Sequence, residues 1–266
     1  MPRIRRAEGD RELLDSHGPE FLEILARGLR IISLFNAERR QLTLSELATL
    51  ADAPRSSVRR VLVTLEKLGF VEQTGRSFKL TPRILTLASA YLISNPLPLI
   101  MQPVVDRISR QIEESCSVAV LDRDDAVMVV RAIPTRIITV GLEVGYRLPA
   151  YCSSVGRVLL GGLEDAELDA YLVRTELKKL TPATVTDKAI LRALVTTDLK
   201  QGYSLVDQEA EPGFRSIAVP VRRRGGSIVC ALHVGLQAER ATIGRILDEF
   251  LPLLRTSADE AGQLIV

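Results

Sequence analysis

Apolar residues recur at helical spacing near the start of the chain. The first series consists of Leu22, Leu25, Leu29, Ile32 and Phe35. A period of three or four residues places such side chains on one stripe of an α-helix, so a helix is predicted to begin near Glu20. Thr43 and Glu46 have the spacing of a capping box, which predicts a second, shorter helix after Thr43.

The third helical pattern divides into an apolar face and a basic face. Pro54 suits the first turn of a helix, and Gly69 is expected to end it. The apolar positions that share one face of a helical wheel are Val58, Val61, Leu62, Leu65 and Leu68. The opposite face carries Arg55, Ser56, Arg59, Arg60 and Lys67. One face is therefore predicted to pack on the first two helices, while the other can bind a partner.

Two short strands around a tight turn at residues 74–77 are predicted to follow this helix. Three helices and a hairpin in this order describe a winged helix-turn-helix, whose third helix enters the DNA major groove. The residues predicted to contact DNA are Thr43, Ser45, Arg55, Ser56, Ser57, Arg59, Arg60, Val63, Arg76 and Lys79. Val63 lies within the polar face, where it suits a thymine methyl group better than water. A basic helical face alone is more often only solvated, so the prediction depends on the whole ordered set.

The rest of the chain mixes helical and strand-like patterns. A helix is predicted over residues 81–94, then a break at NPLP, then a second helix from about Leu99 to Glu114. The strand-like runs are CSVAVLD, AVMVVRAI and RIITVGLE, with SIAVPV and SIVCALHVG as a later hairpin. Helical stretches are predicted at about Val155 to Leu172 and Lys188 to Gln201, and an amphipathic helix closes the chain. Helices flanking a largely antiparallel sheet indicate an α+β sensor domain.

Composition narrows the classes of function. The formal net charge of +2 is too small to indicate nucleic-acid binding by itself, so any basic function must occupy a local patch. Three scattered cysteines without metal-ligand spacing fit a reducing interior, and no metal site or cofactor is predicted. No signal peptide and no run of 18 apolar residues is found, so we expect a cytoplasmic protein without a membrane partner.

Several stretches resemble the IclR family of bacterial transcription regulators. They are FLEILARGLRIISLF, LTLSELATLADAPRSSVRRVLVTLEKLGFVEQTGRSFKLTPRIL, LPAYCSSVGRVLLGGL and GYSLVDQEAEPGFRSIAVPVRRRGGSIVCALHVG. The motifs ARGL, LTPRIL and VLDRDDAVMVVRAIPTR are most similar to the branch that controls catabolism of protocatechuate, 4-hydroxybenzoate and β-ketoadipate. The resemblance implies a winged helix-turn-helix joined to a GAF-like, profilin-like domain that binds a small aromatic or dicarboxylic acid.

The resemblance also implies an organisation and partners. We expect a flexible basic arm at 1–19, the DNA-binding domain at 20–81, a linker helix and junction at 82–98, and an effector-binding domain at 99–266. The implied partners are a pseudo-palindromic double-stranded DNA operator and a second copy of the chain, paired through the first helices. Two such dimers are expected to form a tetramer.

The family's effector pocket can be carried over onto this chain by motif position. The matching residues are Ile137, Val140, Leu148, Ser154, Val155, Val206, Ser216, His233 and Gly235. Val206 is apolar and His233 bulky where members that bind small keto acids are polar, which favours a ring-shaped effector. The ring is expected between Leu148, Val140 and Val206, with a hydroxyl group on His233 or Ser216. A lone histidine in an apolar strand is, however, more often a core residue than a ligand contact, and only the match to the family's pocket makes the two interpretations equal for His233.

Residues in and near the stretch LPAYCSSVGRVLLGGL extend this predicted pocket. Ser153 and Ser154 precede a predicted helix, whose N-terminal amides attract a carboxylate, although ordinary N-capping explains these serines equally well. Tyr151 is included as a candidate that hydrogen-bonds an aromatic acid. Arg136 and Tyr146 have the same two interpretations, effector contact or surface and sheet packing.

Two other classes of function are kept as alternatives. Cys152 near a helix start suits a thiol redox sensor or reductase, but only His17 and His233 are available to activate it. The winged helix can also serve as an interaction module without DNA, although its arginines argue against that. Within the regulator class, another small-carboxylate pathway is the alternative to aromatic acids. We therefore predict a regulator with no catalytic residues.

Overall fold

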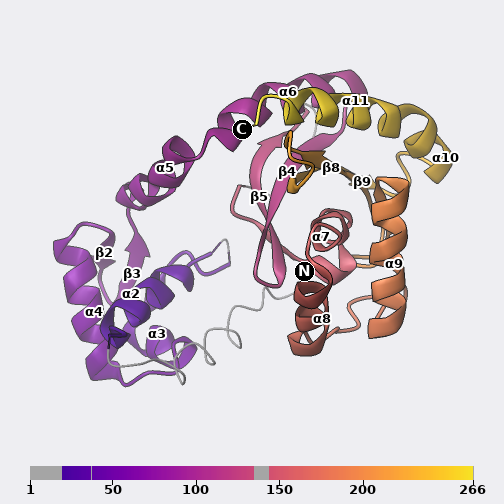
Figure 1. Cartoon of the computed structure of the whole chain (residues 1–266). Coiled ribbons are helices and arrows are strands. Elements are labelled where there is room, and N and C mark those ends of the chain that lie inside the picture. Colours follow the sequence, from indigo (N-terminus) through magenta and orange to yellow (C-terminus); the bar gives the residue numbers. More distant parts are fainter. Residues whose placement is uncertain (1–19, 37, 135–143, 266) are drawn as a thin grey trace. The chain divides into compact units, whose positions relative to one another are not determined.

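A computed structural model of the chain describes residues 20–36, 38–134 and 144–265 (Figure 1). Contacts within it form two compact units, of which the first ends at Ser94 and the second begins at Asn95. The predicted strand RIITVGLE, at residues 136–143, and the predicted arm at 1–19 lie outside the described residues.

The N-terminal unit combines a helical cluster with a small antiparallel sheet of the order β1-β3-β2. Its elements are α2 (Glu23–Ser33), β1 (Leu42–Thr43), α3 (Leu44–Leu50), α4 (Arg55–Lys67), β2 (Val71–Thr74), β3 (Ser77–Leu80), η1 (Pro82–Ile84) and α5 (Leu85–Ser94). Strand β1 was not predicted, because its two residues carry no strand pattern and depend on pairing Leu42 with Phe78. The winged helix-turn-helix predicted from the sequence is confirmed.

The apolar face of α4 forms the core of this unit, but Leu68 and part of the α2 stripe do not join it. Val58, Val61, Leu62 and Leu65 are buried, whereas Leu68 at the helix end is 52% exposed. On α2 only Ile31 is fully buried, and the predicted stripe of Leu22, Leu25 and Leu29 is more than half exposed. A Cβ added at Gly28 would lie 3.9 Å from Val61, so α2 approaches α4 through its Gly28 face and turns the leucine stripe away.

The C-terminal unit is built on one sheet of the order β6-β5-β4-β9-β8-β7, in which every neighbouring pair is antiparallel. Its elements are α6 (Pro96–Ile112), β4 (Ser115–Asp122), β5 (Asp125–Ala132), β6 (Arg147–Pro149), η2 (Ala150–Cys152), α7 (Ser154–Leu160), α8 (Asp165–Arg174), α9 (Lys188–Gln201), β7 (Ser204–Asp207), β8 (Phe214–Arg222), β9 (Ile228–Gln237), α10 (Ile243–Arg245), the π-helical turn η3 (Ile246–Phe250) and α11 (Leu251–Gly262). The predicted α+β class is confirmed.

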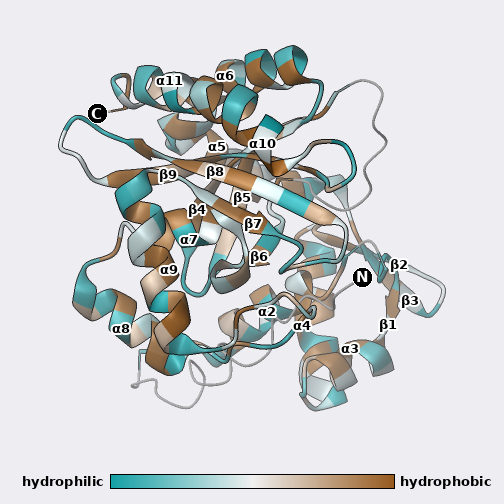
Figure 2. Cartoon of the chain, turned by 90° about the vertical axis from the view of Figure 1, so that its right-hand side faces the viewer, coloured by the Kyte–Doolittle hydropathy of each residue, from teal (hydrophilic) through white to brown (hydrophobic). Residues whose placement is uncertain are grey.

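Helices cover both faces of this sheet (Figures 1 and 2). Helices α6 and α11 pack on one face, where Met101, Ile108 and Leu254 meet strand residues such as Val118 and Leu232. Helix α7 packs on the other face, and α8 and α9 lie beyond it. Small side chains on the sheet, alanines above all, let α7 approach it closely: Ala119, Ala126, Ala218 and Ala231.

Two helix boundaries differ from the sequence prediction. Helix α6 begins at Pro96 rather than near Leu99, because the Asn95 side chain caps it by accepting a hydrogen bond from the Leu97 N–H at 3.0 Å. Prolines in the first turn are tolerated there, since those N–H groups have no partner within the helix. The single helix predicted at about 155–172 is two helices, α7 and α8, separated by residues 161–164.

Among the described residues, no single helix has the length and apolar composition needed to cross a membrane. One pair passes only when taken together, Pro82–Ser94 with Pro96–Ile112, and it is broken between them.

Candidate functional site

The exposed face of α4 carries the polar residues predicted to contact DNA. Arg55, Ser56, Arg59 and Arg60 are exposed, and Ser57 is half-buried. Val63 is 42% exposed among them, although valine favours burial. An exposed, basic helix face with one methyl-bearing side chain has the composition needed to read base edges in a major groove.

One predicted DNA contact at the start of α3, Thr43, also caps that helix. The Thr43 hydroxyl donates to Glu46 Oε2 at 2.8 Å and accepts from the Glu46 N–H at 3.3 Å, which confirms the predicted capping box. Hydrogen bonds from the Thr43 backbone and side chain lower the pKa of Glu46. Ser45 is exposed in the first turn of the helix.

The wing presents the other two predicted basic contacts. Arg76 is exposed in the turn after Gly75, which has a φ of 62°. Lys79 lies 2.6 Å from the Glu72 carboxylate across the hairpin, and both side chains are about half exposed. Lys79 must therefore exchange this ion pair before it can bind a phosphate, whereas Arg76 needs no such exchange with Glu72.

In the C-terminal unit, strand pairing gathers several predicted pocket residues on one face of the sheet. One row of directly paired residues runs across it as Val206, Ser216, Gly235 and Ser115. The adjacent row on the same face runs Ser204, Ala218, His233, Ser117 and Arg131. The four predicted residues Val206, Ser216, His233 and Gly235 come from three strands, so only the tertiary fold brings them together.

A cavity of about 160 Å³ opens on these rows. It is lined by Glu114, Ser115, Ser117, Met128, Arg131, Leu148, Phe214, His233, Gly235, Leu236, Gln237 and Arg240. The prediction included Leu148, His233 and Gly235 but missed Ser115, Ser117 and Arg131. A signal for the serines was present, because they alternate with Cys116 and Val118 and so mark a small, polar face on a strand otherwise apolar.

Other predicted pocket residues are buried near the cavity without lining it. The Ser154 hydroxyl donates to Ser216 Oγ at 2.9 Å, and Val155 is fully buried against the sheet. Ser153 has the capping role, since its hydroxyl accepts from the Gly156 N–H at 3.2 Å. Val206 is also buried, 3% exposed.

The predicted aromatic contacts have structural roles in the described chain. The Tyr151 hydroxyl donates to the Lys178 carbonyl at 2.8 Å, and Tyr151 is not among the residues that line the cavity. Tyr146 and Leu148 pack against the apolar cluster that includes Val155 and Val158 of α7. Burial raises the pKa of the Tyr146 phenol. Ile137, Val140 and Arg136 lie outside the described residues.

His233 is the most unusual group in the cavity. It is 4% exposed, and its Nδ1 atom is buried with no hydrogen-bond partner. Burial, reinforced by the nearby positive charge of Arg131, lowers the pKa of His233 to about 3. The imidazole is therefore neutral at physiological pH, with one nitrogen able to donate and the other to accept. A Cβ added at Gly235 would lie 2.8 Å from His233 Cε1, so the glycine leaves room for the ring.

The three thiols lie in buried surroundings that disfavour the thiolate form. Cys116, Cys152 and Cys230 are buried and unpaired. Burial raises the pKa of Cys152 to about 12, and the negative charge of Glu209 adds to the effect. A thiolate is the reactive form of cysteine, and the raised pKa disfavours that form of Cys152 at neutral pH. No group of three or more potential metal ligands occurs within the described ranges.

A buried ion pair beside α7 was missed by the sequence analysis. Arg157 Nη2 lies 2.7 Å from Glu209 Oε2, and the side chains are only 3% and 10% exposed. Arg157 also donates to the Tyr151 carbonyl, and Glu209 accepts from the Val185 N–H. Charges 52 residues apart in sequence give no pairing signal, so this contact could not have been predicted.

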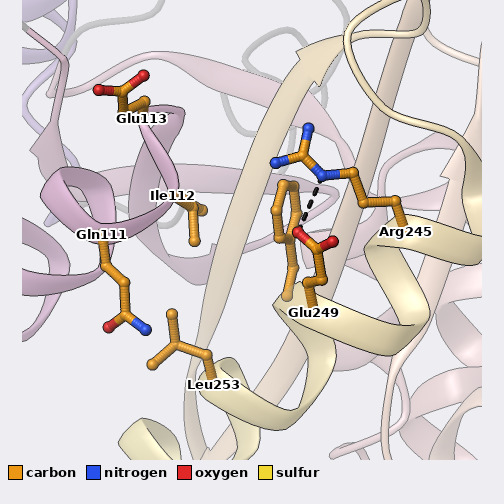
Figure 3. Close-up of a pocket in the computed structure, with 7 residues that line it drawn as sticks. Gln111, Ile112, Glu113, Arg245, Glu249 and Leu253 are labelled. Carbon is orange, nitrogen blue, oxygen red and sulfur yellow. Dashed lines mark hydrogen bonds and ion pairs between the residues drawn. The ribbon is translucent and has the colours of Figure 1, made fainter.

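A second cavity, of about 270 Å³, lies between the end of α6 and the start of the C-terminal helices (Figure 3). Figure 3 shows the Arg245–Glu249 ion pair at its side, with a separation of 2.9 Å and both side chains about half exposed. None of the described residues that line this second cavity has a buried polar atom without a partner. It therefore offers less specific recognition than the cavity at His233.

Comparisons with known proteins relate both units to one family. The family model described as "Bacterial transcriptional regulator IclR C-terminal" matches residues 89–262. The model described as "IclR helix-turn-helix domain" matches residues 24–75.

Individual relatives cover nearly the whole chain. The Pca regulon regulatory protein of Pseudomonas putida is 44% identical over 92% of this chain and 85% of its own length. The p-hydroxybenzoate hydroxylase transcriptional activator of Acinetobacter baylyi is 33% identical over 92% and 93%. An IclR homolog from Microbacterium hydrocarbonoxydans, crystallised in complex with 4-hydroxybenzoate, has a TM-score of 0.77 and 26% identity over 90% and 97%.

Proposed function

Because this chain belongs to the IclR family of bacterial transcriptional regulators, we propose that a small aromatic acid controls its binding to operator DNA. DNA binding is assigned to the exposed face of α4 and to the β2–β3 wing. Effector binding is assigned to the cavity at His233. The resemblance inferred from the sequence, including the branch that controls aromatic catabolism, agrees with these relatives.

The size and lining of the cavity carry the proposal of a ring-shaped effector. An apolar protein cavity of about 150 Å³ is large enough to hold benzene. The cavity here, of about 160 Å³, has the room for one such ring between Met128, Leu148 and Phe214. The 4-hydroxybenzoate complex of the Microbacterium homolog supports an effector of this class.

Exposed apolar side chains in the N-terminal unit support pairing with a second copy. Helix α5 is rich in apolar residues but has no buried one. Its Leu85, Leu87 and Ile93 side chains are each at least half exposed. The α2 leucine stripe, Leu22, Leu25 and Leu29, is exposed to a similar extent. Apolar patches of this kind mark protein interfaces. We propose a homodimer that reads a pseudo-palindromic operator and associates further into a tetramer.

Control by the effector requires a difference in affinity rather than catalysis. A ligand changes DNA binding only as far as it prefers one arrangement of the assembly over another. Such coupling is commonly about 1–3 kcal/mol and acts equally in both directions. The buried thiols give the redox alternative no support, and the exposed arginines of α4 favour DNA over a DNA-free interaction module.

Salt-dependent operator binding tests the DNA interface. Replacing Arg59 or Arg60 with Ala should weaken specific binding by about 1–3 kcal/mol if the side chain reads a base edge. Arg76→Ala should weaken binding to all sequences alike and lower the salt slope by about one unit. Fluorescence anisotropy with operator and scrambled duplexes at several salt concentrations measures both.

Lys200→Ala is the matched control, because Lys200 is exposed on α9 in the other unit. It should bind as the wild type does. Wild-type operator affinity in the Arg59 and Arg60 variants would contradict the groove assignment. For the effector, a thermal-shift screen of aromatic and aliphatic carboxylates separates an aromatic pathway from another small-carboxylate pathway.

A further inference from the structure

We propose that Glu72 limits the affinity of the chain for DNA by competing with phosphate groups for Lys79. The inference rests on the proposed DNA-binding function and deepens it, because it names a residue that weakens the DNA interface instead of forming part of it. Lys79 thereby differs from Arg76, the other predicted basic contact of the wing.

Strand register places Glu72 and Lys79 directly opposite each other on the wing. The two residues are a cross-strand pair of β2 and β3, and Lys79 Nζ lies 2.6 Å from Glu72 Oε1. Directly opposed side chains of an antiparallel pair are close neighbours, so the two charges meet without a large loss of side-chain freedom. The side chains are 41% and 50% exposed, so a phosphate group from solution can reach this ion pair.

Lys79 lies on the outer face of the wing sheet. Successive side chains of a strand point to opposite faces. Phe78 and Leu80 pack against the apolar core of the N-terminal unit, so Lys79 points away from that core. Ser77 shares the outer face with Lys79 and is paired with Thr43, another residue predicted to contact DNA. The ion pair therefore neutralises a lysine on the surface that also carries a predicted DNA contact.

Glu72 has no structural task of the kind that Glu46 has. Glu46 accepts hydrogen bonds from the N–H and the hydroxyl of Thr43, each at 2.8 Å, and so caps α3. The Glu72 carboxylate pairs with Lys79 and makes no other ion pair or side-chain hydrogen bond with the residues that the structure describes. An exposed cross-strand charge pair contributes little to stability. Its larger expected consequence is for the anion that Lys79 can bind.

Binding to DNA requires Lys79 to exchange one anion for another. A phosphate contact adds a charge-assisted hydrogen bond, which is worth roughly 10- to 100-fold in affinity. Breaking an exposed ion pair removes up to about fivefold from that gain. Lys79 therefore still binds phosphate, but Glu72 reduces its net contribution. Arg76 has no such loss, since its exposed guanidinium forms no ion pair within the described part of the chain.

The competition acts on operator and non-operator DNA alike, because phosphate contacts carry no sequence information. Glu72 therefore lowers the occupancy of non-operator DNA, which depends almost entirely on such contacts. It also weakens the operator complex, which keeps that complex within reach of an effector whose coupling is limited.

A double-mutant cycle on the full chain tests the competition, with DNA affinity measured by fluorescence anisotropy. The probes are a duplex that the wild-type chain selects from a random library and a random-sequence duplex of the same length. Glu72→Gln should strengthen binding to both duplexes by about 2- to 5-fold, because the released Lys79 no longer gives up an ion pair. Combined with Lys79→Met, the same substitution should change affinity by less than about 1.5-fold, since no lysine remains to be released.

Glu66→Gln is the matched control, because Glu66 is an exposed carboxylate of α4 and its loss leaves the Glu72–Lys79 pair intact. Any gain from removing a negative charge near DNA should then be the same with and without Lys79→Met. Thermal melting of every variant checks that it is folded.

Each outcome decides the role of Glu72. An equal gain from Glu72→Gln with and without Lys79→Met indicates general charge repulsion and overturns the inference. Unchanged or weaker DNA binding in Glu72→Gln, with or without a lower melting temperature, leaves Glu72 a structural role alone and also overturns it. If the wild-type chain binds both duplexes equally, the proposed operator recognition is wrong, and the cycle on the random duplex still decides the role of Glu72. If it binds neither duplex, the proposed DNA binding fails and the inference falls with it.

Discussion

At the residue scale, His233 shows how one polar side chain is accommodated inside an apolar sheet. It pairs with Ser117 on one side and Ala218 on the other, so its neighbours across the strands are small. Its low pKa follows from burial and from the charge of Arg131. The neutral ring avoids the large free-energy cost of burying a charge.

This low pKa makes stability depend on pH in a defined direction. The His233 pKa falls from 6.5 to about 3 on folding, so between these values the unfolded chain binds a proton that the native chain does not. The free energy of unfolding is fully retained above about pH 6.5 and should fall by up to about 1.4 kcal/mol for each pH unit below it. Urea denaturation of wild type and His233→Phe between pH 7 and pH 4.5 measures the difference between their slopes.

The comparison with His233→Phe is needed because carboxylates also titrate in acid. The variant should lose less stability than the wild type as the pH falls. Parallel pH profiles for the two proteins would show that His233 is protonated without cost, and that its surroundings are wetter than the structure indicates.

At the element scale, α7 is held by contacts that leave little freedom. A Cβ added at Gly156 would lie 2.2 Å from the Ala150 Cα atom, so only glycine permits η2 and α7 to meet this closely. The next residue, Arg157, joins α7 to Glu209 and to the Tyr151 carbonyl. The position of α7 over the cavity face therefore depends on a glycine and a buried charge pair.

Removing one member of that pair should be strongly destabilising. Arg157→Met should lower the free energy of unfolding by about 3–5 kcal/mol, because Glu209 is left charged and buried. Arg192→Met is the matched control, since Arg192 pairs with Asp165 and Asp169 at the exposed surface, and it should cost less than about 1 kcal/mol. Chemical denaturation measures both.

A double variant separates lost attraction from buried charge. Adding Glu209→Gln to Arg157→Met should restore part of the stability, because the neutral amide still accepts from the Val185 N–H. A double variant less stable than Arg157→Met alone would contradict this account.

At the scale of the whole molecule, the exposed apolar side chains of α2 and α5 are the proposed surface through which two copies of the chain form a dimer. Leu25→Asp places a carboxylate in the proposed α2 interface and should weaken pairing by about 100-fold. The preference for a two-half-site operator over a single half-site should shrink with it. Analytical ultracentrifugation and anisotropy measure the two effects in the full chain.

Leu68→Asp provides the matched control for this prediction. Leu68 is 52% exposed at the end of α4, close to the 59% of Leu25, but it lies outside the α2 stripe. It should leave the assembly unchanged. An unchanged assembly in the Leu25→Asp chain would instead remove α2 from the interface.

The sequence by itself determined the elements whose signals are local. The capping box at Thr43, the amphipathic pattern of α4 and the final β8–β9 hairpin depend on neighbours a few residues apart, and all three are confirmed. Helix boundaries near prolines and glycines were less accurate, as at Pro96 and in the break between α7 and α8. Capping by a single side chain decides such boundaries, and periodicity does not contain that information.

The tertiary structure decided which residues meet. Sequence periodicity identified the α2 leucines as a stripe, but the close approach at Gly28 turned that stripe away from the core. Motif positions placed His233 and Gly235 in the pocket, but only cross-strand register set Arg131 beside Ser117 and His233. The register of β4 with β9 depends on hydrogen bonds between residues more than 100 positions apart, so no local pattern predicts it. The chain therefore specifies its elements locally, whereas the composition of its candidate site is fixed by long-range pairing.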